Sequence, residues 1–466
     1  MAGLGYRLPG TTIEDVTEPS SVNVSSSQRT PVFIGLASDY VFVKQEEVII
    51  SSTGVNDLLY TARGIYEVDK AGTQKGLSDI VEGTAFDLTA DQIVWTSAGL
   101  IALGIGRGAT TYFSYYYDRL YDADYMTDTT KNDYRYKEWT NYGDVVADLG
   151  ERIPANPLVM IAYLALKLFN VPKIATVQVR SSSNSDYIDA LELIKYRDVQ
   201  TICPLTTNAN VRAAYKSHVI ERCLPDNGRY RVLWTGAAVG TPVGDESDPT
   251  SLRGISKLMA NELVVFVNAT RAKYYYNDPT TREELTTVVD GSFIAATIAA
   301  YRDAFNYPST TLLNRTVAGL ELYSDDYDDY YSEYQLTLCG GSSVFIMQSL
   351  AGTIKVIDDL TTDNSTVETN NINIIYAKHY IAKDVAIQMD RTFIGKLILD
   401  RGSFANTVNA YLKLMFTIYH QAGIIEEIGT ITVVLPPNRR DTVEITYSYY
   451  AVYTAKYVTG TYTLEV

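Results

Sequence analysis

Short apolar runs alternate with amphipathic helical segments through the middle of the chain. The run Pro31–Ala37 is continuously apolar, which is typical of a strand buried on both faces of a parallel sheet. From residue 174 to residue 268, strand-like runs alternate with helix-like segments at regular spacing, which indicates βαβ units. The predicted strands are Ile174–Val179, Val199–Leu205, Tyr230–Val239 and Leu263–Asn268, and the predicted helices are Asp186–Arg197, Val211–Cys223 and Leu252–Asn261.

Two more helices are predicted beside these units. The pair Asn156–Pro157 is typical of an N-cap followed by proline at the first helical position. A second helix, Ser292–Phe305, follows the turn at Asp290–Gly291. In the first helix Val159 and Tyr163 lie opposite an apolar face, which indicates burial all round. That face consists of Leu158, Ile161, Ala162, Ala165, Leu166 and Phe169.

Strand-forming patterns dominate residues 46–130, where helical periodicity is weak. β-Branched and aromatic runs are separated by glycines at Val48–Ser52, Gln92–Ser97 and Thr110–Asp118. We therefore expect an inserted, mainly β domain at residues 46–130. It would divide a parallel-sheet α/β domain formed by residues 29–45 and 131–320.

The last third of the chain mixes both patterns and predicts a C-terminal α+β domain at residues 321–466. It starts with a helix that ends at Gly340–Gly341 and continues with a hairpin around Ala351–Gly352. The hairpin strands are Val344–Met347 and Thr353–Ile357, the later helices are Ile372–Met389 and Phe404–Gln421, and the closing strands are Ile424–Leu435 and an alternating run from Val443 to Tyr453.

Both ends of the chain carry strand patterns outside these domains. The first 28 residues are rich in Ser, Thr and Pro and contain few apolar side chains, so they predict an extended arm. In both ends, short segments alternate between apolar and polar residues. Such alternation suits a strand that pairs when a sheet offers a free edge, either in the same chain or in a neighbour. A frayed terminus is the alternative. The candidate exchange residues are Ile13, Val16, Val22 and Val24 in the arm, and Tyr462, Leu464 and Val466 in the last strand.

Composition narrows the possible partners. The length of 466 residues suits about three domains, and 46% hydrophobic with 20% charged residues is ordinary for globular proteins. The net charge of -16 repels phosphate backbones and anionic lipids, which disfavours a nucleic-acid or membrane-surface protein. The 38 tyrosines exceed the 12 phenylalanines and 3 tryptophans together, and tyrosine favours surfaces that meet other proteins.

Neither a disulfide framework nor a targeting segment is predicted. Cys203, Cys223 and Cys339 form no paired pattern and are expected to be reduced thiols. Residues 1–10 contain no apolar signal core, so synthesis in a cytoplasm is expected. The longest uncharged stretch, Tyr334–Ile354, is interrupted by glycines and polar residues, which argues against a membrane span.

The chain offers little catalytic chemistry. His218, His379 and His420 are too widely spaced for a metal motif, and His218 and Cys223 would lie on different helix faces. The segment Gly104–Ala109 fits GxGxxA, but a strand-forming run follows it where a dinucleotide site needs a helix, so we expect a β-turn. GxxxxGK[ST] and GxSxG are both absent from the sequence.

An acidic stretch is the remaining candidate for a metal site. Asp325, Asp326, Asp328 and Asp329 lack the glycine that an EF-hand loop requires. Their interleaving with tyrosines suits the solvated start of a helix, where acidic residues are favoured. We therefore predict no catalytic residue, cofactor or metal site, and four N-glycosylation sequons carry no weight without a secretory signal.

Several segments, in order, resemble the contractile tail sheath protein family. Leu8–Asp15 is similar to the family's Pro-Gly-x-x-x-Glu start, although Thr-Thr-Ile stands where the family usually has an aromatic residue, and Thr30–Gly35 resembles its first core strand. The other resembling segments are Asp290–Ala299, Leu313–Gly319, Gly352–Thr362 with its closing Thr-Thr pair, and the helix Phe404–Gln421 followed by strands. The shared order over nearly the whole chain is the specific part of this resemblance.

The resemblance implies a structural subunit and not an enzyme. Subunits of this family form stacked hexameric rings around a tail tube, joined when terminal arms complete a neighbour's sheet, and they contract from a metastable extended state. Implied partners are the chain itself, the tube protein, and baseplate and tail terminator proteins, in a virion tail assembled in a bacterial cytoplasm. A tailocin or other contractile injection particle is an alternative. A cofactor-binding α/β enzyme and another structural protein, such as an adhesin, are alternatives of other classes.

Overall fold

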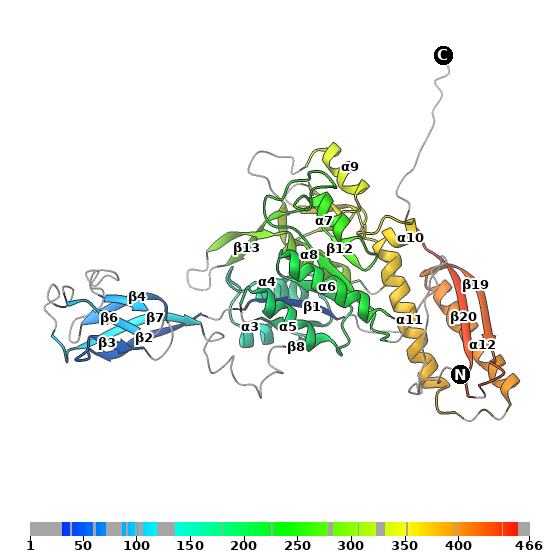
Figure 1. Ribbon diagram of the computed structural model, residues 1–466, viewed down its shortest axis with the longest axis horizontal. Coiled ribbons are helices and arrows are strands. Elements are labelled where there is room, and N and C mark those ends of the chain that lie inside the picture. Colours follow the sequence, from blue (N-terminus) through cyan, green and yellow to red (C-terminus); the bar gives the residue numbers. More distant parts are fainter. Residues whose placement is uncertain are drawn as a thin grey trace, which may run out of the picture.

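The protein has a mixed α/β fold with a parallel-sheet core and several small antiparallel sheets, as predicted. The computed structural model describes residues 30–454 apart from residues 38–39, 59–61, 71–85, 90–91, 98–99, 101–105, 119–135, 180, 225–226, 278–282, 306, 323–330, 351–352, 397, 399 and 440. The α/β core lies in the middle, with two small sheets at one end and α12, β19 and β20 at the other (Figure 1). The domain boundaries given above stay predictions.

A six-stranded sheet forms the centre of the core. Its order is β12-β11-β10-β1-β9-β8, and all neighbours are parallel except β8 and β9. Every residue of the five parallel strands is buried, which explains their continuous apolar sequence. The strands are β1 (Pro31–Gly35), β8 (Tyr136–Trp139), β9 (Ile174–Gln178), β10 (Thr201–Pro204), β11 (Val232–Thr235) and β12 (Val264–Phe266).

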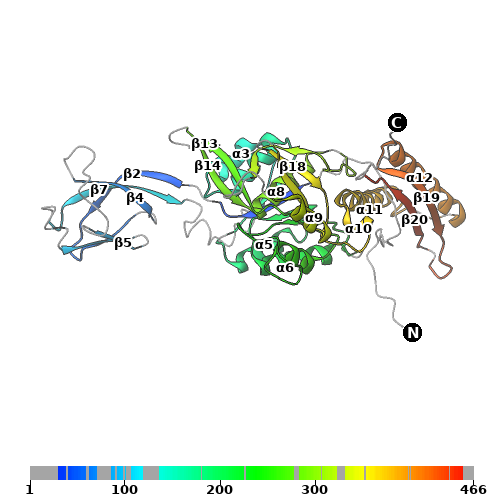
Figure 2. The same cartoon turned by 90° about the horizontal axis from the view of Figure 1, so that it is seen from above.

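Helices cover both faces of this sheet (Figure 2). On one face lie α5 (Asn184–Ile194) and α6 (Ala209–Arg222). The other face is covered by α8 (Gly291–Asp303) and by α4 (Pro157–Ala162), which continues as a π-helical segment, η3 (Tyr163–Leu168). Short helices α3 (Tyr142–Leu149) and α7 (Leu252–Met259) complete the core.

Side-chain caps fix where the predicted helices begin. The Asn156 side chain accepts a hydrogen bond from the Val159 N–H (3.4 Å) with Pro157 at the first position. Asp290 accepts from the N–H groups of Ser292 (2.9 Å) and Phe293 (3.2 Å) at the start of α8. Both predicted helix starts are therefore confirmed.

Other elements differ from the sequence predictions. The strand predicted at Tyr230–Val239 spans only Val232–Thr235. At Gly236 the chain passes so close to Gly291 that a Cβ would lie 2.1 Å from the Gly291 carbonyl oxygen. A three-stranded sheet that the prediction missed packs beside the core. It contains β13 (Arg271–Asn277), β14 (Glu284–Asp290) and β16 (Leu320–Leu322). Only Val289 of β14 is buried, so the strand lacks an alternating pattern.

Two three-stranded antiparallel sheets lie at one end of the molecule (Figure 1). Their small core contains Ile93, Trp95 and Phe113, with the rings of Trp95 and Phe113 edge to face at 5.8 Å. One sheet consists of β2 (Tyr40–Ile49), β7 (Thr110–Asp118) and β4 (Ala62–Lys70), and the other of β3 (Val55–Asp57), β6 (Gln92–Trp95) and β5 (Phe86–Thr89).

The last third combines a small sheet, helices and a terminal hairpin. Val267 of the core bridges to Phe345, which joins this part to the central sheet. The strands are β15 (Thr316–Val317), β17 (Ile346–Leu350), β18 (Thr353–Asp358), β19 (Ile425–Val434) and β20 (Glu444–Ala451), and the helices are α9 (Glu333–Gly341), α10 (Val367–Asn370), α11 (Ile372–Thr392) and α12 (Arg401–Gln421).

Candidate assembly site

The terminal hairpin is a two-stranded sheet whose outer edges have no partner strand among the described residues. Among the described residues, β19 pairs only with β20, and β20 only with β19. Each strand therefore presents one unpaired row of backbone N–H and C=O groups along its outer edge. An isolated hairpin is marginally stable in water, so other contacts must hold this one.

Packing against α12 supplies those contacts. Phe416 of α12 lies 5.1 Å from the ring of Tyr447 and 6.0 Å from that of Tyr449, and these two tyrosines stack at 5.9 Å. Tyr419 and Ile425 belong to the same buried cluster. The hairpin is thus stabilised on one face by a helix, while no strand of the described part of the chain pairs with its outer edges.

A bulge in β19 requires glycine. The pairing register shifts between Ile428 and Ile431, and the Thr430 N–H donates to Ser448 Oγ (2.8 Å) on β20. A Cβ at Gly429 would lie 2.5 Å from that Oγ and 2.7 Å from the Ser448 carbonyl oxygen. The two backbones approach so closely here that no larger residue fits without movement.

Buried polar contacts join α11 to α12. Asp384 is 1% exposed and accepts a hydrogen bond from the Tyr419 hydroxyl (2.9 Å). Burial raises the pKa of Tyr419 well above its usual value, and the Asp384 carboxylate raises it further, so the hydroxyl keeps its proton. Tyr411 donates to Gln388 in the same interface (3.3 Å).

The other half of α11 is fixed to the α/β core. The Tyr376 hydroxyl accepts from Trp234 Nε1 (3.0 Å) and lies 2.7 Å from Thr201 Oγ1. Lys378 pairs with Glu262 at 3.1 Å, and Lys383 with Asp198 at 2.6 Å. Because α11 contacts both the α/β core and α12, it links the terminal hairpin to the core.

The backbone N–H groups at the start of α8 are occupied by the chain itself. The Asp290 side chain accepts from the N–H groups of Ser292 and Phe293 at the start of α8. The Gly291 N–H donates to the Ala237 carbonyl (3.0 Å), so backbone fills the space beside it.

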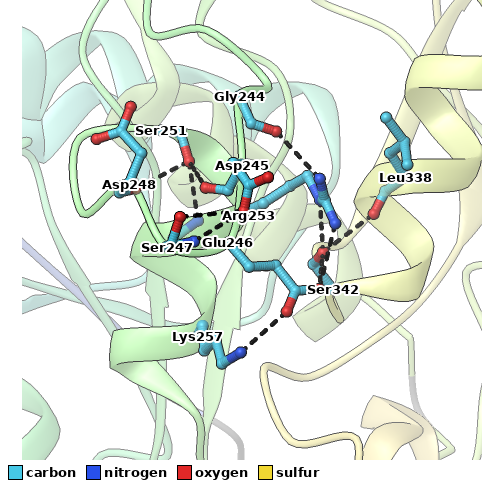
Figure 3. Close-up of polar contacts among 11 residues, drawn as sticks. Gly244, Asp245, Glu246, Ser247, Asp248, Ser251, Arg253, Lys257, Leu338 and Ser342 are labelled. Atoms are coloured by element: carbon cyan, nitrogen blue, oxygen red, sulfur yellow. Dashed lines mark hydrogen bonds and ion pairs between the residues drawn. The ribbon is translucent and has the colours of Figure 1, made fainter.

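The loop between β11 and α7 carries an internally satisfied polar cluster (Figure 3). Glu246 pairs with Lys257 (3.0 Å) and Arg253 (3.3 Å) and accepts from Ser342 Oγ (2.8 Å) at the end of α9. The hydrogen bonds from Lys257 and Ser342 lower the pKa of Glu246. These contacts hold the loop against α9, so the Glu246 carboxylate has a structural role.

His218, His379, Cys203 and Cys339 are buried and Cys223 is partly buried, whereas His420 is exposed. Arg231, which is fully buried, donates from Nη1 to His218 Nε2 and through its N–H to Cys223 Sγ (3.1 Å). Its Nη2 donates to three carbonyls at the end of α5, including that of Ile194 (2.7 Å). Within the described ranges, no three His, Cys, Asp or Glu side chains cluster as metal ligands.

No described helix is long and apolar enough to cross a membrane. At the glycine-rich segment, the Ala109 N–H donates to the Gly106 carbonyl (3.1 Å) and β7 begins at Thr110, which confirms the predicted turn. Residues 101–105 and the acidic stretch Asp325–Asp329 lie outside the described residues.

Comparison with solved structures identifies the fold. The chain aligns with the helical sheath of the anti-feeding prophage in its contracted state over 99% of this chain and 100% of that chain, with a TM-score of 0.53 and 11% identity. It aligns with the contracted sheath complex of PVC, an extracellular contractile injection system, over 100% and 99%, with a TM-score of 0.52 and 10% identity. This chain has the fold of a contractile sheath subunit.

A sheath tail protein from Desulfitobacterium hafniense aligns with a lower TM-score of 0.43, at 12% identity over 91% of this chain and 93% of that chain. No family model matches the sequence, and no curated protein is significantly similar to it. At identities near 10%, the sheath fold is recognised by its three-dimensional arrangement.

One motif that carries the resemblance has a structural role in this sheath fold. Thr362 Oγ1 donates to the Met259 carbonyl (2.9 Å) and accepts from the Asn261 N–H (3.1 Å), where α7 leads into β12. Thr361 Oγ1 donates to the Thr369 carbonyl (2.6 Å) of α10. The Thr-Thr pair therefore joins the core to the segment that enters α11.

The exchange residues predicted from the sequence lie outside the described residues. They are Ile13, Val16, Val22, Val24, Tyr462, Leu464 and Val466, so their pairing stays a prediction. The sequence reasoning missed the buried Arg231 and the open-edged hairpin as a recipient. The alternating run from Val443 to Tyr453 predicts strand β20, but nothing in this run predicts that the outer edge of the strand lacks a partner in the described chain.

Proposed function

We propose that this chain is the structural subunit of a contractile sheath. The observation that carries the proposal is the full-length match to two sheath structures. A terminal hairpin whose outer edges have no partner strand in the described residues supports it. In the proposed assembly, subunits polymerise as stacked hexameric rings around a tail tube. The sheath would drive the tube through a cell envelope by relaxing from a metastable extended state.

Strand addition is the proposed link between subunits. The arm at residues 1–28 of one copy and the last strand of another would pair with the outer edges of β19 and β20. Main-chain hydrogen bonds of this kind persist while the domains that they join rotate. The packing of α11 against the core would carry the movement of the joined sheet to the rest of the subunit.

The proposed particle includes other proteins. Tube, baseplate and tail terminator proteins would be its partners, and a phage tail assembled in a bacterial cytoplasm would be its location. A tailocin or another injection particle is the alternative location, since the similar PVC sheath belongs to an extracellular contractile injection system. The assembly needs no nucleotide, because the energy would be stored in subunit contacts.

Negative-stain electron microscopy of the concentrated full-length chain tests the proposal. We expect hollow tubes or six-fold rings. Deletion of residues 1–28 should leave a folded monomer that forms no long tubes, because the arm precedes the first core strand. Dispersed monomers of the full chain, unchanged by added tube protein, would contradict the proposal. Unfolding of the truncated chain would contradict the role of the arm alone.

A further inference from the structure

Four basic side chains gather where α11 ends, α12 begins and the loop between β19 and β20 turns. Arg391 lies in the last turn of α11, and Lys396 lies in the connection from α11 to α12. Arg401 is the first residue of α12, and its Nη2 donates to the carbonyls of Pro436 (2.9 Å) and Arg439 (2.8 Å) in the loop. We call Arg391, Lys396, Arg401 and Arg439 the basic tip. Three of them are exposed, and Arg401 is partly buried.

Aromatic packing holds the two helix ends of the basic tip together. The ring of Phe393, after α11, lies edge to face with the rings of Phe404 (5.7 Å) and Tyr411 (5.5 Å) in α12. Lys396 Nζ lies 5.9 Å from the centre of the Phe393 ring, and Ile394 is 44% exposed. The basic tip therefore combines positive charge with exposed apolar surface, which favours a protein as its partner.

The charges of the basic tip have no acidic partner in the part of the chain that the structure describes. None of its four residues forms an ion pair there, whereas Lys383 of α11 pairs with Asp198. Nearby Asp400 accepts hydrogen bonds from backbone N–H groups at the start of α12. Residues 391–421 contain four basic residues and one acidic residue, although the whole chain has a net charge of -16. A positive surface on an acidic protein favours contact with an acidic surface of a second copy.

We propose that the basic tip binds the acidic run at residues 321–333 of a second copy, a contact that rests on the proposed function. This run contains six acidic residues, four tyrosines and no basic residue. Guanidinium groups pair with carboxylates and stack on tyrosine rings, so the run matches the basic tip in charge and in composition. Residues 323–330 of the run lie outside the described residues.

The basic tip and the acidic run belong to opposite sides of one subunit. The run connects β16 to α9, and α9 lies at the top of Figure 1, whereas α11 extends downward from the core to the basic tip. Because β16 and α9 anchor the run at both ends, its partner is the basic tip of another copy. A contact between two different surfaces of identical subunits is heterologous and repeats from copy to copy, as a stack of rings requires.

Charge reversal in two separate chains tests this contact. The tip variant is Lys396→Glu/Arg439→Glu, and the run variant is Asp326→Lys/Asp329→Lys. Each variant alone should raise the critical concentration for polymerisation about tenfold, as measured by sedimentation of the polymer. An equimolar mixture of the two variants should return to within about threefold of the wild type, because each reversed surface then meets its opposite charge on the other variant.

Lys167→Glu is the control, because Lys167 is exposed in η3 and lies outside the basic tip, so this variant should polymerise like the wild type. Higher ionic strength should raise the critical concentration of the wild type, since salt screens exposed charges. If the tip variant polymerises like the wild type, or if the mixture stays as impaired as each variant alone, the contact is wrong and the proposed function still stands. A wild-type chain that forms no polymer would overturn both.

Discussion

Two buried histidines should make the core sensitive to mild acid. His218 is 8% exposed and His379 is 3% exposed. Burial lowers the pKa of both to about 3, with a further contribution from Arg231 at His218 and from Lys378 at His379. In the unfolded chain a histidine has a pKa of about 6.5. Between these values the unfolded state binds protons that the folded state does not, so stability falls as the pH falls.

The size of the effect follows from proton linkage. Between pH 7 and pH 5 each histidine should cost about 2 kcal/mol, and the pair about 4 kcal/mol, whenever the folded pKa lies below 4. Carboxylates with lowered pKa contribute mainly below pH 5, so this window isolates the histidines. Against a typical domain stability of about 5–15 kcal/mol, the loss is large.

Urea unfolding of the monomer at pH 7 and pH 5, at constant ionic strength, measures this loss through the fluorescence of the buried Trp139 and Trp234. The double variant His218→Gln/His379→Phe keeps an acceptor for Arg231 and a ring beside Tyr230, and it should lose less than about 1 kcal/mol over the same range. An equal loss in wild type and variant would refute the assignment to these histidines.

Two further substitutions address the terminal hairpin. Tyr419→Phe removes a donor to the buried Asp384 and should lower the unfolding free energy by about 1–3 kcal/mol, whereas Tyr411→Phe, in a longer and partly exposed hydrogen bond, should cost less than about 1 kcal/mol in the same urea titration. Gly429→Ala should destabilise the β19–β20 hairpin by about 1–3 kcal/mol and reduce polymerisation, because the added Cβ would overlap Ser448. The control Gly402→Ala should behave like the wild type, because the nearest atom to its added Cβ lies 3.9 Å away. Equal melting temperatures and equal tube yields for the two alanine variants would count against the role of the bulge.

The core elements could be predicted because their signals are local. The run Pro31–Ala37 is apolar throughout since β1 is the fourth strand of a six-stranded sheet with helices on both faces. The starts of α4 and α8 carry capping residues, Asn156 and Asp290, within a few residues of the groups that they bind.

Other features depend on contacts between distant parts of the chain. Arg231 looks like an ordinary charged residue, and only the carbonyls at the end of α5, more than 30 residues earlier, explain its burial. Strand β14 was missed because a strand with one buried residue has no period-two pattern. The outer edges of the hairpin, which pair with no other strand of the described residues, are a property of packing, so no sequence pattern marks them.

The most direct test of the proposed assembly is a cryo-electron microscopy reconstruction of the full-length polymer at a resolution that separates strands. We expect the β19–β20 sheet to gain strands at its outer edges, and we expect these strands to trace to residues 1–29 of one neighbouring copy and residues 455–466 of another. A polymer in which this sheet keeps two strands, with subunits joined only through other surfaces, would contradict it.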